Sequence, residues 1–419
     1  MAARSPSPCH AERRAKHPLL ARLRFPVGGV LGLAVALLLS ACGGAAAPAS
    51  APASASAAAS APAVSAPASG KPSPAASAAA SAAAPASWDE LLAAAKREGT
   101  VVIGGPPEQA TRTQLPEMMK QRFGIEVQYL TQTSSQIAQR LATERAAGQY
   151  TLDLMLAGSD TAYTTLLGQG WADPLKPALV MPGVADPGSW KTGGPWFRDS
   201  QQQYVLQVFN SMQPIVTINT QLIPDTISTA DQLLDPKYKG KIAAFDPTVN
   251  GIGVQVGAAL YASKGEDFLK KLYVDQKVTF TQDYRQIADW AAHGNYPIAI
   301  GVAPAYLELY KQAGITFATP EMSDAHSAVQ GGFGLVVLVN HAPHPNAARV
   351  LANFIASKDG LTMYSQTQQQ VPVRSDIDPT WLPQSLIPQP GVAYYDGYDP
   401  QFLATRRAPV LDFFKKLLK

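Results

Sequence analysis

Cysteine and histidine are scarce in this chain of 419 residues. The two cysteines, Cys9 and Cys42, both stand near the N-terminus, so the rest of the chain has no disulfide, no cysteine metal site and no cysteine nucleophile. Only four of the six histidines lie beyond residue 42, and the motifs G-x-S-x-G, H-E-x-x-H and G-x-x-x-x-G-K-[S/T] do not occur. These absences argue against an enzyme, and we expect no catalytic residue, no cofactor and no metal.

Long hydrophobic runs are also missing, with one exception. The run Phe25–Leu39 follows a basic stretch, is shorter than the roughly 18–20 residues that span a bilayer, and ends in small residues. This arrangement is typical of a signal peptide. Residues 39–42, with the sequence LSAC, resemble the bacterial lipobox, in which cleavage occurs just before a cysteine that receives a lipid. We therefore predict a signal peptide over residues 1–41 and lipidation of Cys42.

No excess of basic charge remains after this leader is removed. The whole chain has 34 Lys and Arg against 31 Asp and Glu, and residues 1–41 hold six of the basic and one of the acidic residues. The remaining chain therefore has 28 basic and 30 acidic residues, a net charge close to −2. A nearly neutral chain has no electrostatic footprint for nucleic acid, so no nucleic-acid partner is expected.

Residues 43–87 contain only Ala, Ser, Pro and Gly, apart from Val64 and Lys71. Such a composition cannot bury enough apolar surface to fold. It predicts that residues 42–87 are a lipidated cysteine followed by a disordered tether, about 35–40 Å long as a flexible coil. A tether of this length would let a folded domain move close to a membrane partner.

The rest of the chain, residues 88–419, alternates between short apolar strands and amphipathic helices, and Ser87 has the spacing of a helix cap. Strands are expected at residues 101–103, 125–129, 152–156, 241–245, 278–280 and 297–302. This alternation predicts an α/β fold, and about 330 residues exceed one comfortable core, so two lobes are expected. The last helix is expected to pack Phe402, Val410, Phe413 and Leu417.

Four polar, glycine-containing loops follow predicted strands, at residues 104–108, 157–160, 246–253 and 301–305. In open α/β sheets, ligands bind beyond the carboxyl ends of the strands, where helix N-termini offer free N–H groups. These loops therefore predict a binding site. The ligand-binding residues expected from these loops are Gly105, Pro106, Ser159, Asp160, Thr248, Asn250 and Gly251.

The charge of the ligand stays open at this point. Thr248 and Asn250 add donors to a helix N-terminus, and the guanidinium of Arg285 suits a carboxylate or phosphate, which favours an anion. An equally weighted alternative is an ordinary helix cap with Arg285 in solvent. A cation would instead use Asp160, Asp246 and Asp283 with aromatic walls.

Several segments resemble bacterial extracellular solute-binding proteins of the type II class, in the branch that holds ferric-ion, thiamine, polyamine and phosphonate binders. These segments are Trp88–Gly99, Leu234–Ile242, Tyr296–Gly301 and Ala342–Ala348, and the second, LDPKYKGKI, is the sharpest. The resemblance covers about residues 88–377. It implies a two-lobed type II periplasmic-binding-protein fold, with a ligand cleft between the lobes that hinge closure shuts.

The same resemblance implies where the lobes begin and end. Lobe 1 would comprise residues 88–213 and 323–375, lobe 2 would comprise residues 214–322, and residues 376–419 would form a C-terminal helical segment on lobe 2. The chain is expected to cross between the lobes near residues 211–214 and 319–330.

The implied function is that of a lipid-anchored substrate-binding protein of an ABC importer, exported to the outer face of the cytoplasmic membrane or to the periplasm. As a monomer it would capture a small solute, with an anion as one option, and deliver it to ABC permease subunits. Two alternatives stay open: the ligand-binding subunit of a membrane sensory receptor, and an enzyme on the same fold.

Two features bear on metal binding. In the ferric-ion branch, adjacent tyrosines follow the strand that matches residues 297–302, whereas this chain has Pro304 and Ala305 there, which disfavours a ferric site. The same branch holds an anion at the loop that matches residues 246–253, and a second contact to it falls near Tyr284. The resemblance therefore implies three further ligand-binding residues, Tyr284, Arg285 and the nearby Tyr306. The segment His341–Asn346 holds two histidines, but its prolines are expected to set the start of a helix rather than a metal site.

Overall fold

The computed structural model describes residues 87–131, 134–330, 332–391 and 394–419. The predicted signal peptide, the lipidation site Cys42 and all of the predicted tether except Ser87 lie outside the described residues. Within the described part of the chain, no helix is both long and apolar enough to cross a membrane.

The folded part begins as the sequence predicts. Ser87 caps helix α1 (Trp88–Glu98) by accepting a hydrogen bond from the Glu90 amide at 3.3 Å, and Gly99 ends the helix in the left-handed conformation. The chain then alternates through β1 (Thr100–Gly105), α2 (Gln109–Phe123), β2 (Glu126–Thr131), α3 (Ser134–Ala146) and β3 (Leu154–Ala157). The α/β fold class is thereby confirmed.

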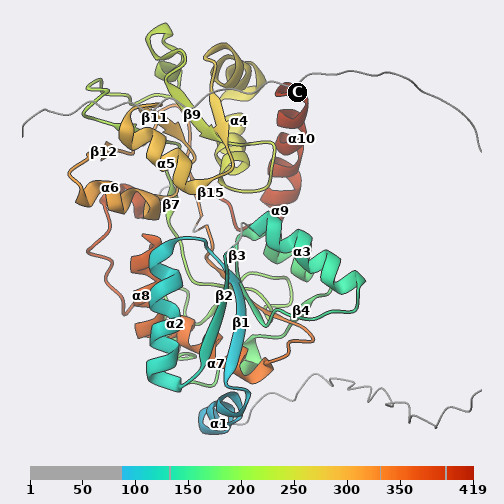
Figure 1. Ribbon diagram of the computed structural model, residues 1–419. Coiled ribbons are helices and arrows are strands. Elements are labelled where there is room, and N and C mark those ends of the chain that lie inside the picture. The colour runs from blue at the N-terminus through green and yellow to red at the C-terminus, as the bar shows by residue number, and fades with distance from the viewer. Residues whose placement is uncertain (1–86, 132–133, 331, 392–393) are drawn as a thin grey trace, which may run out of the picture. The chain divides into compact units, whose positions relative to one another are not determined.

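The first sheet has the strand order β2-β1-β3-β14-β6-β5, with β4 also paired to β14. Figure 1 shows β1, β2 and β3 side by side. Its late strands are β4 (Ala172–Asp173), β5 (Trp196–Phe197), β6 (Leu206–Gln207) and β14 (Leu335–Val339). Strands β1, β2 and β3 are parallel, whereas β14 returns from far along the chain and runs antiparallel to β3. Successive residues of β14 enter the hydrophobic clusters on opposite faces of the sheet, so all five are buried.

The second sheet has the order β10-β9-β11-β8-β12 and its own hydrophobic core. Its strands are β8 (Val216–Asn219), β9 (Ile242–Phe245), β10 (Thr279–Thr281), β11 (Ile298–Ile300) and β12 (Phe317–Ala318), and its helices are α4 (Ile252–Lys270), α5 (Tyr284–His293) and α6 (Glu308–Gln312). Two sheets with separate cores account for the two-lobed architecture.

A third, small sheet contains β7 (Met212–Gln213), β13 (Ala328–Val329) and β15 (Tyr395–Asp396). Strand β7 lies in the sequence between the first-sheet strand β6 and the second-sheet strand β8, and β13 lies between β12 and the returning β14. The two therefore pair side by side where the chain passes between the sheets. The lobe boundaries inferred from the family resemblance stay a prediction.

The remaining helices are α7 (Pro345–Ala356), α8 (Lys358–Gln368), α9 (Pro400–Phe402) and α10 (Ala408–Leu417). The short turns are η1 (Thr161–Leu167), η2 (Lys176–Ala178), η3 (Pro187–Ser189), η4 (Asp231–Leu234), η5 (Pro236–Tyr238), η6 (Lys271–Asp275), η7 (Pro304–Leu307), η8 (Gln384–Leu386) and η9 (Leu403–Arg407).

The predicted packing of the last helix is confirmed. Phe402 and Val410 are buried in the core of the second sheet, and Phe413 and Leu417 pack against it while partly exposed. The fully buried ring of α10 is that of Phe414, which the sequence analysis did not name. Phe414 packs on Gly257 of α4 and lies edge-on to Tyr273, with ring centroids 4.9 Å apart. Val410 and Phe414 lie four residues apart in α10, so both face the core of the second sheet.

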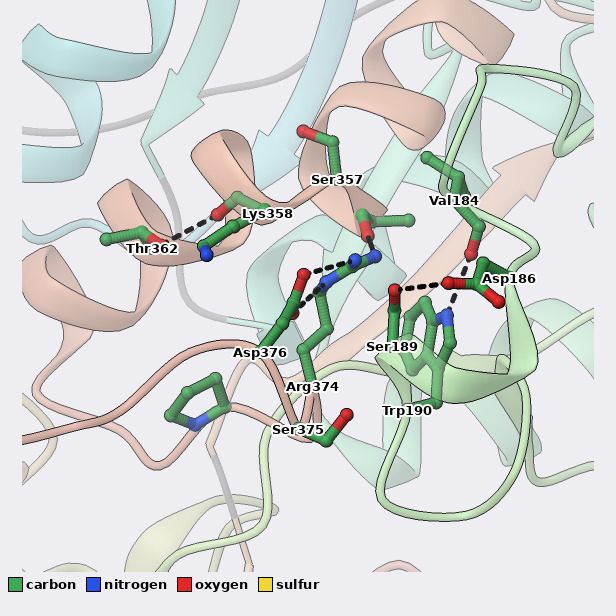
Figure 2. A network of polar contacts seen from close by, with 12 residues as sticks. Val184, Asp186, Ser189, Trp190, Ser357, Lys358, Thr362, Arg374, Ser375 and Asp376 are labelled. Carbon is green, nitrogen blue, oxygen red and sulfur yellow. Dashed lines mark hydrogen bonds and ion pairs between the residues drawn. The ribbon is translucent and has the colours of Figure 1, made fainter.

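A network around the buried Arg374 ties the segment after α8 to the first core (Figure 2). The guanidinium donates to both carboxylate oxygens of Asp376, at 2.8 and 2.9 Å, and to the Ala356 carbonyl at the end of α7. It also lies over the ring of Trp190, whose indole N–H donates to the Val184 carbonyl at 2.7 Å. Three segments distant in the sequence are joined here.

Candidate functional site

A cavity of about 340 Å³ lies where loops from both sheets meet. Its walls include residues that follow β1, β3, β9 and β11, the strands after which the sequence places its four polar loops. These strands belong to two different sheets, so the cavity draws its walls from both. This is the arrangement that open α/β folds use for ligands.

Seven of the ten expected ligand-binding residues line this cavity, namely Pro106, Ser159, Asp160, Asn250, Gly251, Tyr284 and Tyr306. The other three lie outside its lining. The Tyr129 hydroxyl covers Gly105, since a Cβ there would come within 2.5 Å of that oxygen. The hydroxyl of Thr248 turns back to donate to Asp246 Oδ1 at 2.6 Å.

Arg285 is placed differently from the expectation. It lines an adjoining cavity of about 460 Å³, which shares Gln282, Tyr284 and Tyr306 with the first one. Asp283 caps α5 by accepting from the Arg285 amide at 2.7 Å, and the Arg285 residue is exposed. This placement agrees with the alternative in which Arg285 stands in solvent on its helix. Contact between Arg285 and a ligand stays a prediction. A ligand would have to reach into the adjoining cavity to make that contact.

Three stacked aromatic rings form one wall of the cavity. Phe245 stacks on Tyr284 with centroids 4.6 Å apart, and Tyr284 stacks on Tyr306 at 5.6 Å. Burial raises the pKa of Tyr284 to about 12 and, aided by the neighbouring Tyr284 and Glu108, raises the pKa of Tyr306 as well. Both phenols are therefore protonated at neutral pH, and they present hydrogen-bond donors rather than phenolate ligands.

Glutamine is the commonest residue in the cavity lining and was missed by the sequence analysis. Among the described residues, eight glutamines line the cavity: Gln136, Gln139, Gln213, Gln255, Gln282, Gln330, Gln368 and Gln370. Each amide can donate and accept hydrogen bonds without carrying charge. The cluster QTQQQ at residues 366–370 is the one visible sequence signal for this set.

Glycine lets α4 start directly against the cavity. Gly251 has a φ of 148°, precedes the first residue of α4 and leaves the helix start without a side-chain cap. A Cβ at Gly253 would overlap the carbonyl oxygen of Phe245, so only glycine lets the helix approach the end of β9 this closely. Gly251 and Ile252 both line the cavity, which places the free N–H end of a long helix at its wall.

One charged residue, Asp160, stands among the described residues of the lining. Its carboxylate forms an ion pair with Arg407, a buried residue of η9. Burial lowers the pKa of Arg407 to about 9, so its guanidinium is still a cation at neutral pH.

Another polar group of the lining, the hydroxyl of Ser159, is buried and has no partner in the described part of the chain.

The histidines behave as parts of turns. His344 immediately precedes α7, where its amide donates to Asp153 Oδ1 at 2.7 Å and its ring lies 2.9 Å from Asp153 Oδ2. Pro345 takes the first position of α7, as the sequence predicts. Among the described residues, no three His, Cys, Asp or Glu side chains come together as a metal site.

With this fold and this cavity in place, comparison with known proteins gives the class of the protein. The sequence model of the family of bacterial extracellular solute-binding proteins matches residues 99–367, well over half of the chain. The chain belongs to this family, whose members are transport binding proteins of the extracellular or periplasmic space rather than enzymes. No curated protein sequence matches it.

Solved structures of periplasmic binding proteins share the fold at low sequence identity. P5PA is 14% identical with a TM-score of 0.62, over 77% of this chain and all of that one. AfuA from Actinobacillus pleuropneumoniae, with exogenous fructose 6-phosphate bound, is 17% identical with a TM-score of 0.60, over 76% of this chain and 98% of AfuA. Iron-bound HitA from Pseudomonas aeruginosa is 15% identical with a TM-score of 0.54, over 76% of this chain and 99% of HitA.

Proposed function

We propose that this protein is the lipid-anchored solute-binding component of an ABC importer, which captures a small polar solute in the 340 Å³ cavity and hands it to a membrane permease. The observation that carries the proposal is the origin of the cavity walls in both sheets. A solute bound there contacts both lobes, so its binding energy favours the closed arrangement. Membership of the solute-binding family supports the same role.

The hydrogen-bonding groups of the cavity suit an organic solute that carries an anionic group. The N-terminal end of α4 supplies backbone N–H groups and the positive end of the helix dipole. Beside it in the lining stand the buried hydroxyl of Ser159, which lacks a partner in the described residues, and the protonated phenol of Tyr306. AfuA, with fructose 6-phosphate bound, is a fold relative whose ligand has this chemistry.

Iron is a weaker candidate than an organic anion. HitA shares the fold and is iron-bound in its structure, but among the described residues of this chain no three His, Cys, Asp or Glu side chains come together. In the segment that follows β11, the lining residues Pro304 and Ala305 have no oxygen or nitrogen side chain to bind a metal, and Tyr306 is the one lining residue there that has an oxygen donor. We therefore expect the protein to act without a bound metal.

A titration of the purified protein tests the proposal. Hexose phosphates, sugar acids, dicarboxylates, polyamines and ferric citrate are each followed by isothermal titration calorimetry, and an organic anion is expected to bind. Gln255→Leu should weaken that binding about three- to tenfold, since it removes one amide from the lining. The matched change Gln114→Leu, on the exposed face of α2, should leave it unchanged. Binding that ignores Gln255, or equal loss in both variants, would contradict the assigned cavity.

Attachment to a membrane rests on Cys42 and is tested separately. Cys42→Ser removes the thiol that would receive the lipid, so the protein should move from the membrane fraction to the soluble fraction. Cys9→Ser, inside the predicted signal peptide, should leave the distribution unchanged. Fractionation followed by immunoblotting measures both, and a Cys42→Ser protein that stays with the membrane would refute the anchor.

A further inference from the structure

The cavity contains one formal charge in its described lining, and that charge is cancelled by a residue outside the lining. Asp160 points part of its carboxylate toward the cavity, with its side chain 20% exposed, while the side chain of Arg407 is 3% exposed. The other described lining residues are uncharged, and most of the polar ones are glutamines. The electrostatic character of the site therefore depends on one ion pair.

Arg407 is held in place by packing rather than by the ion pair alone. It ends η9 between Phe402 and Val410, which both belong to the core of the second sheet. Asp160 follows β3 of the first sheet and immediately precedes η1, whose Ala162 packs in a cluster of the first sheet. The core of the second sheet thus holds the guanidinium of Arg407, and the first sheet holds the carboxylate of Asp160 with which it pairs.

Charges in the adjoining cavity do not disturb this balance. Asp283 and Arg285 both line that cavity, and they carry opposite charges. Removal of either partner of the Asp160–Arg407 pair would therefore leave a single uncompensated charge next to the solute. Loss of the arginine would leave a carboxylate beside the aromatic wall of Tyr284 and Tyr306, a combination that attracts organic cations.

We propose that Asp160 and Arg407 form a charge-selectivity pair, which makes the cavity accept uncharged and anionic solutes and exclude cationic ones. The proposal rests on the proposed function in taking this cavity as the solute site. Arg407 acts through Asp160 as a positioning and neutralising residue. It lies more than 240 residues along the chain from its partner, in the C-terminal segment.

Three variants separate charge selectivity from a structural role. Arg407→Met leaves the carboxylate unpaired, Asp160→Asn leaves the guanidinium unpaired, and the double variant Asp160→Asn/Arg407→Met has neither charge. A purely structural contact would make the two single variants change solute binding in the same direction. A selectivity pair makes them change it in opposite directions, because they leave charges of opposite sign.

The probes are spermidine as a cation and inorganic phosphate as an anion, measured by calorimetry with each folded variant. Arg407→Met should bind spermidine at least tenfold more tightly than the wild type or the double variant does. Asp160→Asn should bind phosphate at least tenfold more tightly than the double variant does. If Arg407→Met does not fold, as judged by circular dichroism, the phosphate comparison decides.

Two results would overturn the selectivity pair. One is spermidine binding that is equal in Arg407→Met and the double variant, and the other is a wild type that already binds spermidine tightly. In the second case the proposed capture of a small solute would still stand. If the wild type binds none of the organic solutes, the proposed function fails, and the comparison between variants still decides the role of the pair.

Discussion

Single residues of this protein carry charge in two contrasting settings. The pair of Asp160 and Arg407 stands beside a cavity, where it sets the potential that a solute meets. The pair of Arg374 and Asp376 stands away from that cavity, where the bidentate contact fixes a segment between α7 and Trp190 (Figure 2). The same chemistry therefore serves selectivity in one place and stability in the other.

The stability role of Asp376 gives a pH-dependent prediction. Hydrogen bonds from Arg374 hold the pKa of the Asp376 carboxyl below its usual range. The unfolded carboxyl titrates near pH 3.9, so the folded state is stabilised above that pH, and the stabilisation is lost as the pH falls through the lower folded pKa. Asp376→Asn should cost about 1–3 kcal/mol in the free energy of unfolding at pH 7, since a buried guanidinium loses its charged partner.

Urea denaturation at several pH values measures this effect. The difference between wild type and Asp376→Asn should shrink below about pH 4, where the wild-type carboxyl begins to take up a proton. Asp412→Asn, at a side chain that is 72% exposed, should change stability little at any pH. A gap that stayed constant down to pH 2 would show that the carboxylate charge does not matter at this position.

The sequence predicted those cavity residues that stand directly after the carboxyl ends of strands, where open α/β sheets bind ligands. Pro106, Ser159, Asn250 and Gly251 stand in loops after buried strands, and parallel strands bring such loops to one edge of a sheet. It missed the glutamines because most of them stand singly in the sequence, and the one cluster, at residues 366–370, does not show that its amides face a cavity. It missed Arg407 because nothing in the local pattern links a C-terminal arginine to an acid after β3.

Among the elements, α10 is where local pattern and tertiary packing diverge most clearly. The sequence pattern placed Phe413 and Leu417 against the core, where both pack while partly exposed, but it missed Phe414, whose ring is fully buried. The strands β4, β5 and β7 have only two residues each, too few for any periodicity to show. Longer elements such as α1 and α5 were predictable, because they contain enough residues for the spacing of apolar side chains to show.

The difference in burial between Phe413 and Phe414 makes a matched pair of substitutions informative. Phe414→Ala should destabilise the protein by about 3–5 kcal/mol, because the ring is fully buried against α4 and Tyr273. Phe413→Ala should cost less than half as much, since its ring lies partly exposed, edge-on to Tyr261 at 5.8 Å. Chemical denaturation compares the two, and equal costs would contradict this difference in burial.

At the scale of the whole molecule, two sheets with separate cores are joined where β7 and β13 pair. Few strand residues connect the sheets, whereas the cavity draws residues from both. A hinge at such a junction needs only small changes in backbone angles to move one core relative to the other. A bound solute adds contacts to both cores at once and should hold them together.

Small-angle X-ray scattering with and without the tightest-binding probe of the solute panel tests this central claim most directly. We predict that saturation with the probe lowers the radius of gyration of the protein, and that Gln255→Leu requires a higher probe concentration for the same decrease. Tight binding that leaves the scattering profile unchanged would contradict capture of the solute by closure of the two lobes.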